Sequence, residues 1–115
     1  MTITETIRLS ILKAAIEAEP LKGRPMKCDF IGDWETPLRE SGLEFTQIQF
    51  IDAVYSLFTD GYVDVSKYDG PGSLDFQGDR HALGEFLTHG EFCIEVNPSG
   101  KEYHERLPKR GRLGF

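Results

Sequence analysis

Apolar residues recur at helical spacing close to the beginning of the chain. They fall three or four positions apart and comprise Ile7, Ile11, Ala15 and Ala18, with Leu9, Leu12 and Ile16 beside them. Thr2 followed three positions later by Glu5 has the spacing of a capping box, in which two side chains satisfy backbone N–H groups of the first helical turn. Pro20 cannot continue a helix. The pattern predicts an amphipathic helix that ends before Pro20.

A second helical pattern occupies the middle of the chain. Thr46 and Gln49 form another capping box, and the apolar positions that follow are Ile48, Ile51, Val54, Tyr55 and Phe58. Gly61 is suited to the left-handed conformation that ends many helices. Residues 62–66 then alternate between apolar and polar side chains, which predicts a strand.

The stretch between these two helices contains several helix breakers. Two prolines and two glycines lie within residues 20–34, which indicates a connection rather than a long element. We expect the apolar residues near its end to reach the core; these are Phe30, Ile31 and Trp34. A short helix is predicted over residues 35–41, with Pro37 in its first turn and Gly42 as its stop.

Glycine and proline are also concentrated in residues 67–78, which are expected to form an exposed loop. Asp79 is placed to cap a short helix that Gly90 ends, with apolar positions at Leu83, Phe86 and Leu87. Residues 92–96 are predicted to form a second strand. A turn at 97–100 should lead into a last short helix at 101–106.

Length and composition place the chain among small globular domains. It has 115 residues, of which 39% are hydrophobic, enough for one core. No apolar run approaches the ~20 residues that cross a bilayer.

The elements together predict an α+β domain with three to five helices and a short antiparallel sheet. We expect residues 1–106 to form this single domain and residues 107–115 to form a flexible basic tail.

The chain has two widely separated cysteines, Cys28 and Cys93, which match no disulfide framework or metal motif. We expect reduced thiols, although a single disulfide remains open if the two residues meet in space. The first residues show no basic segment leading into an apolar one, so no secretory signal is expected. These observations favour a cytoplasmic protein with no membrane association.

Charge is distributed unevenly along the sequence. The formal net charge is −6, but residues 28–96 contain fourteen Asp or Glu and only three Lys or Arg, a local charge of −11. Residues 1–27 carry +2 and residues 97–115 carry +3. The acidic middle should repel nucleic-acid phosphate, whereas the basic ends could attract it.

Two segments resemble winged helix-turn-helix proteins. Residues 50–65, FIDAVYSLFTDGYVDV, resemble the third helix of that family and the strand that follows it. Residues 94–105, IEVNPSGKEYHE, resemble the place where the second wing strand enters the final helix. The resemblance implies a winged-helix-like domain. The sequence departs from the family in having about 25 residues between the two strands, and in having no Lys or Arg among the polar positions of helix 46–60.

Residues with catalytic or metal-binding potential do not form a convincing site. His81, Glu85 and His89 would share one face of a helix, but the segment is short and Gly84 interrupts it. Neither cysteine lies in a catalytic signature, and the carboxylates have no His partner in the pattern. We expect no enzymatic activity, no cofactor and no metal.

Two functions fit these observations. The first is a non-enzymatic protein-interaction module whose acidic central surface engages a protein partner, with candidate contacts at Gln47, Gln49, Asp52, Tyr62, Tyr68 and Phe76. The second is a DNA-binding transcriptional regulator that uses helix 46–60 and the basic termini, with candidate contacts at Gln47, Gln49, Lys109, Arg110 and Arg112. We expect the first, and a homodimer is compatible with both.

Overall fold

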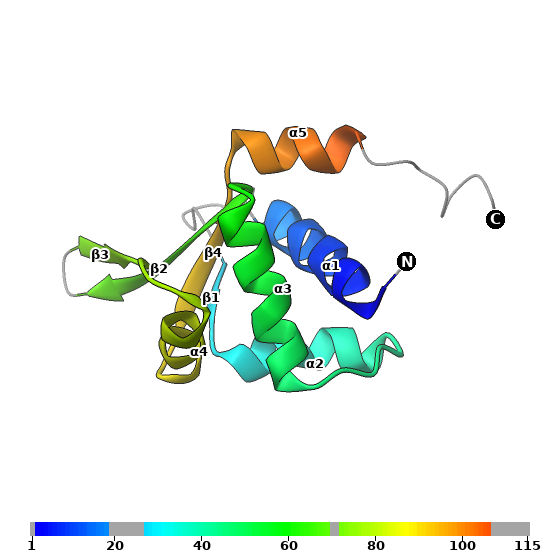
Figure 1. The fold of residues 1–115 in the computed structure, drawn as a ribbon, viewed down its shortest axis with the longest axis horizontal. Coiled ribbons are helices and arrows are strands. Elements are labelled where there is room, and N and C mark those ends of the chain that lie inside the picture. Colours follow the sequence, from blue (N-terminus) through cyan, green and yellow to red (C-terminus); the bar gives the residue numbers. More distant parts are fainter. Residues whose placement is uncertain (1, 19–26, 70–71, 107–115) are drawn as a thin grey trace.

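The computed structural model describes residues 2–18, 27–69 and 72–106, which form five helices and four strands (Figure 1). In chain order the elements are α1 (Ile3–Ala18), β1 (Lys27–Asp29), α2 (Ile31–Glu40), α3 (Gln47–Thr59), β2 (Val63–Asp69), β3 (Gly72–Asp75), α4 (Arg80–Thr88), β4 (Phe92–Val96) and α5 (Pro98–Arg106). The predicted α+β class is confirmed.

The four strands make one antiparallel sheet in the order β1-β4-β2-β3. Strand β4 therefore lies between β1 and β2, although it comes last in the sequence. In its pairing with β2, Val65 stands opposite Ile94 and Asp64 stands opposite Glu95. Because side chains alternate between the two faces of a strand, the first pair faces the core and the second faces away from it.

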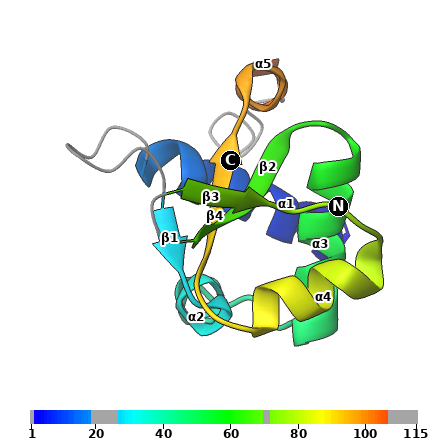
Figure 2. The same cartoon turned by 90° about the vertical axis from the view of Figure 1, so that its left-hand side faces the viewer.

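Helices α1 and α3 pack against one another and cover the core face of the sheet, as Figure 1 and Figure 2 show. Helix α4 lies beside α3, and α5 lies beside α1. The core consists of apolar side chains from all of these layers. Its largest fully buried members include Phe50, Phe92, Ile7, Ile11, Leu57, Leu83 and Ile94.

The predicted capping box at Thr46 and Gln49 is confirmed, and at Thr2 and Glu5 the half in which the hydroxyl caps a backbone N–H is present. The Thr2 hydroxyl accepts the N–H of Glu5 at 3.1 Å, and the Thr46 hydroxyl accepts the N–H of Gln49 at 3.2 Å. The Gln49 side chain in turn accepts the N–H of Thr46 at 2.8 Å. Gly61 follows α3 with φ of 81°, as expected of a residue that ends a helix in the left-handed region.

Helix α2 begins earlier than the sequence indicated. It starts at Ile31, so Pro37 lies inside the helix rather than in its first turn. The Asp33 carboxylate accepts the N–H of Phe30 at 3.3 Å and so stabilises the earlier start. Trp34 is buried and stacks on Phe92 as expected, but Phe30 is 54% exposed and the prediction that it reaches the core is wrong.

The expected loop at 67–78 is also wrong in part. Strand β2 continues to Asp69, and β3 pairs with it from Gly72 to Asp75. The backbone of Phe76 continues this ladder by donating to the carbonyl of Val65 at 2.7 Å. Of the glycines that indicated a loop, Gly72 begins β3 and Gly78 follows it with φ of 143°, whereas Gly70 and Pro71 lie outside the described residues.

Helix α5 begins at Pro98, three residues before its expected start, and it is attached to Tyr62, just before the start of β2. The Asn97 N–H donates to the carbonyl of Tyr62 at 3.1 Å, and the Asn97 side chain accepts the N–H of Gly100 at 2.9 Å. The rings of Tyr62 and Tyr103 stack with centroids 4.3 Å apart. These contacts hold the last helix against the sheet.

Cysteine chemistry differs from the expected reduced thiols. Cys93 is disulfide-bonded and 1% exposed. Cys28, the only other cysteine of the sequence, is its register partner, because β1 pairs with β4. The two residues are distant in the sequence, so only the strand order brings them opposite each other.

Candidate functional site

The polar residues of α3 are largely engaged within the protein. Gln47 is exposed, but the side-chain oxygen of Gln49 is used by the capping box. The carboxylate of Asp52 forms an ion pair and hydrogen bond with Arg80 of α4. Of these three predicted contact residues, only Gln47 is therefore exposed and not engaged in a contact that the structure describes.

The predicted aromatic contact residues do not form an exposed set. Tyr62 is half-buried in its stack with Tyr103. Phe76 is 4% exposed, so the prediction that it is a surface residue is wrong. Only the backbone of Tyr68 is described. The basic tail with Lys109, Arg110 and Arg112 lies outside the described residues.

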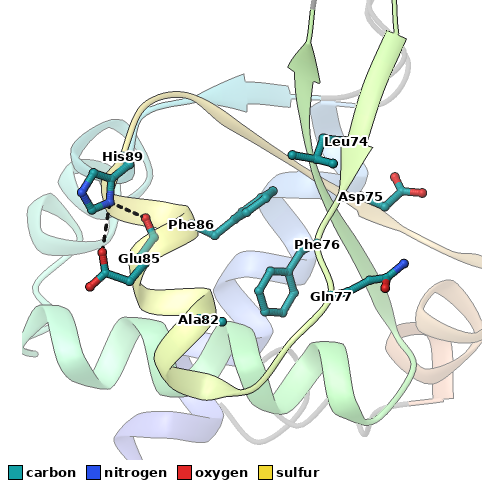
Figure 3. Close-up of a pocket in the computed structure, with 8 residues that line it drawn as sticks. All are labelled: Leu74, Asp75, Phe76, Gln77, Ala82, Glu85, Phe86 and His89. Carbon is teal, nitrogen blue, oxygen red and sulfur yellow. Dashed lines mark hydrogen bonds and ion pairs between the residues drawn. The ribbon is translucent and has the colours of Figure 1, made fainter.

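A groove lies between the β3 hairpin strand and α4, in a region that the sequence assigned to a loop (Figure 3). Its volume is about 840 Å³. Four apolar side chains and four polar ones line it: Leu74, Phe76, Ala82 and Phe86, with Asp75, Gln77, Glu85 and His89. Leu74 is 55% exposed, whereas Phe76, two residues further along the chain, is buried.

Three phenylalanine rings, those of Phe58, Phe76 and Phe86, pack together beside the groove. Phe76 makes edge-to-face contacts with Phe58 of α3 and with Phe86 of α4, at centroid distances of 5.1 and 5.3 Å. Such contacts add about 0.5–1.5 kcal/mol each beyond simple burial. They connect α3, the segment after β3 and α4, so the groove is held by three elements.

Lys67 closes one side of this aromatic group. Its ammonium lies 4.7 Å from the centre of the Phe86 ring and donates to the carbonyl of His89 at 2.7 Å. Partial burial removes water from the ammonium and lowers the pKa of Lys67 below its ordinary value. This cation is therefore directed to the protein rather than to solvent.

His89 and Glu85 are the members of the suspected metal-binding triplet that contact each other. His89 Nδ1 is 2.7 Å from the Glu85 carbonyl oxygen and 3.5 Å from the Glu85 carboxylate (Figure 3). A carbonyl can only accept, so Nδ1 carries the proton and donates it. Among the described residues, no group of His, Cys, Asp or Glu is arranged to hold a metal ion.

The sheet face that points away from the helices carries three carboxylates, Asp64, Asp75 and Glu95, which we call the acidic sheet face. Asp64 and Glu95 are direct partners across β2 and β4, and Asp75 stands opposite Ser66, two residues from Asp64. Like charges directly opposite on adjacent strands destabilise a sheet. Asp75 also lines the groove, so the two features adjoin.

The cations of the central region do not neutralise this face in the structure. Arg39 contacts Glu35 and the Phe45 ring, and Arg80 contacts Asp52. Lys67 is held over Phe86. Asp64 and Asp75 are exposed, so part of the negative charge of residues 28–96 lies on this face.

Sequence reasoning missed both the groove and the like-charge pair. The alternation of Leu74, Asp75 and Phe76 was the available signal for β3, since it has the period of a strand. The neighbouring glycines and proline obscured it. The Gln49 capping box was recognisable from the sequence and already implied that the Gln49 side chain is occupied.

Comparisons with protein-family models, with curated proteins and with solved structures gave no match for this chain. Within the described residues, none of the helices combines the length and the apolar character needed to cross a bilayer.

Proposed function

We propose that the protein is a non-enzymatic protein-interaction module on a winged-helix-like scaffold, and that its acidic central surface engages a basic protein partner. The observation that carries this proposal is the pair Asp64 and Glu95, held opposite each other on the acidic sheet face. The pair costs stability in the free protein, and a partner's Lys or Arg placed between the carboxylates would relieve the repulsion.

The arrangement of elements supports the scaffold part of this proposal. Helices α2 and α3 are joined by a short turn at residues 41–46, and β2 and β4 pair antiparallel after α3. A helix-turn-helix followed by a two-stranded wing requires this order. In this protein β3 and α4 are inserted between the two wing strands, and α5 follows the second.

The alternative, a DNA-binding transcriptional regulator, has less support. The exposed positions of α3 carry no Lys or Arg, Gln49 is used in a cap, and Asp52 is paired with Arg80. Phosphate contacts from Lys and Arg supply most of the affinity of DNA-binding proteins. The basic termini, including Lys109, Arg110 and Arg112 outside the described residues, would have to supply it without help from α3.

A binding experiment separates the two functions. A fluorescein-labelled peptide of sequence Lys-Lys-Ser-Lys-Lys and a mixed-sequence DNA duplex are each titrated with the protein at about 50 and 200 mM salt. We expect the peptide to bind at the lower salt and the duplex to remain free. Duplex binding that weakens steeply at the higher salt, without peptide binding, would favour the regulator instead.

Two charge-reversal variants make this measurement specific. Asp64→Lys is expected to weaken peptide binding at least about fivefold, since a mutated charge at the contact surface changes the encounter and the pairing. Glu40→Lys, at the exposed end of α2, changes the net charge by the same amount away from the acidic sheet face. Equal loss of peptide binding in both variants would mean that only net charge matters, which contradicts the proposal.

The same substitution has an expected effect on stability. Asp64→Lys should raise the free energy of unfolding by about 0.5 kcal/mol, because an attractive pair with Glu95 replaces a repulsive one. The double variant Asp64→Lys with Glu95→Lys restores a like-charge pair and should lose this gain. Urea unfolding of wild type, the two single variants Asp64→Lys and Glu95→Lys, and the double variant measures it, and additive effects of the two substitutions would show that the side chains do not interact.

The cytoplasmic location expected from the sequence belongs to this proposal as well. The disulfide at Cys93 is the observation against it, because the cytosol keeps most thiols reduced. Thiol labelling of cells quenched directly in a denaturing acid tests the location, because denaturation exposes the buried Cys93. A cytoplasmic protein should then be labelled at both cysteines, and an unlabelled one would indicate an oxidising compartment.

A further inference from the structure

We infer that the groove between β3 and α4 binds an aromatic or large aliphatic side chain of the partner, from a segment in which that side chain is flanked by Lys or Arg. This inference rests on the proposed function and adds the apolar part of the recognised segment. It extends the contact surface from the acidic sheet face onto the adjoining hairpin and helix.

The apolar part of the groove is suited to one large side chain. Leu74 and Phe86 face each other across it, with Phe76 and Ala82 below (Figure 3). The groove is shallow and open to solvent, so a side chain presented on a partner's surface can reach it. Leu74 is more than half exposed, so a partner's apolar side chain can bury it and gain affinity from the apolar area removed from water.

Charge complementarity indicates the residues that flank this anchor. Asp75 and Glu85 line the groove, and the Asp75 side chain points over the edge strand β3 onto the acidic sheet face (Figure 3), whereas Lys67 is turned to the His89 carbonyl and the Phe86 ring. Asp75, Glu85 and Lys67 sum to −1, and the acidic sheet face continues the negative charge beyond Asp75. A basic segment therefore meets attraction at the rim, and an acidic one meets repulsion.

The groove is built before any partner arrives. The ring contacts of Phe76 connect it to α3 and α4, and the carboxylate of Asp79 caps α4 by accepting the N–H of Ala82 at 2.9 Å. Preorganised sites lose little conformational entropy on binding. Leu74 is therefore exposed on a strand whose neighbouring residue, Phe76, is packed against α3 and α4.

The test uses two peptides that differ at one position, Lys-Lys-Phe-Lys-Lys and Lys-Lys-Ser-Lys-Lys, titrated into the full-length ¹⁵N-labelled protein. We expect the phenylalanine peptide to bind about tenfold more tightly, the worth of one well-buried side chain. Its amide shifts should concentrate at residues 74–77 and 82–89, whereas the serine peptide should shift mainly residues 64 and 95.

Two exposed apolar residues supply the matched variants. Leu74→Ser should remove the preference for the phenylalanine peptide and leave serine-peptide binding unchanged. Ile48→Ser changes an equally exposed apolar side chain, 62% exposed, that does not line the groove, and should keep the preference. Because both positions are exposed, neither variant is expected to unfold the protein.

The possible outcomes distinguish this inference from the proposed function. Equal binding of both peptides with shifts only at the acidic sheet face would overturn the groove inference and leave the proposed function standing. Binding of neither peptide would overturn both. Analytical sedimentation of the free protein tests whether a second copy of the chain fills the groove. A dimer that Leu74→Ser converts to monomer would show that it does, contrary to the inference.

Discussion

An alanine at position 100 is expected to lower the free energy of unfolding by about 3 kcal/mol, the upper part of the range for overpacked interiors. A Cβ on Gly100 would lie 2.2 Å from the carbonyl oxygen of Tyr62 and 2.7 Å from a methyl carbon of Val96. The Tyr62 oxygen is part of the backbone and accepts the N–H of Asn97, so it cannot rotate aside. Helix α5 must move, and the stack of Tyr62 on Tyr103 is disturbed.

Urea unfolding of Gly100→Ala against wild type measures this loss. Ser99→Ala is the control, because Ser99 is exposed in the same helical turn, and its effect should stay within about 0.5 kcal/mol. A Gly100→Ala protein that unfolds at the wild-type urea concentration would contradict the close approach of α5 to Tyr62, just before the start of β2.

Reduction of the disulfide at Cys93 is expected to cost about 4 kcal/mol of stability, the entropy of closing a loop from Cys28 to Cys93 in the unfolded chain. The loop spans more than half of the protein, so the cross-link restricts the unfolded state strongly. Unfolding by urea with and without a phosphine reductant gives the difference. Thiol titration of the denatured protein should find no free thiol before reduction and two after it.

Cys93→Ala supplies the control for this measurement, because a protein without the bond should unfold at the same urea concentration whether or not the reductant is present. A wild-type protein that is equally insensitive would show that the two strands are not cross-linked in solution. The same result bears on the cellular compartment of the protein, because disulfides persist in oxidising surroundings and are rare in the cytosol.

The acidic sheet face and the groove place different demands on a partner, and together they define a composite surface. Asp64 and Glu95 supply charge on a flat sheet, which accelerates association and is weakened by salt. Leu74 and Phe86 supply an apolar anchor, whose contribution depends little on salt. The salt dependence of binding in the Leu74→Ser and Asp64→Lys variants should therefore differ.

Helix α3 illustrates how tertiary structure reassigns residues that look available in a sequence. Its polar positions suggested a recognition surface, but Arg80 of α4 takes the Asp52 carboxylate and the α3 capping box takes Gln49. The first partner lies 28 positions away in the chain and could not be anticipated. The second lies three positions away, and its capping box was visible from the start.

The sequence by itself determined the helices and the long central strands. Thr2 with Glu5 and Thr46 with Gln49 stabilise helix starts through contacts that span three residues, so local pattern was sufficient. The same holds for Asp79 at the start of α4 and for the apolar run of β4. The excess of carboxylates in residues 28–96 was equally a property of the sequence alone.

Only the tertiary structure decided the remainder. Strand β1 has three residues, too short to show a period, and the four residues of β3 give only a weak one; both strands form because β4 and β2 offer them backbone partners. The same pairings set Cys93 opposite Cys28 and Asp64 opposite Glu95, and they form the groove beside α4. Each of these features depends on strand order and register, which arise from burying one shared core and leave no mark at any single position of the sequence.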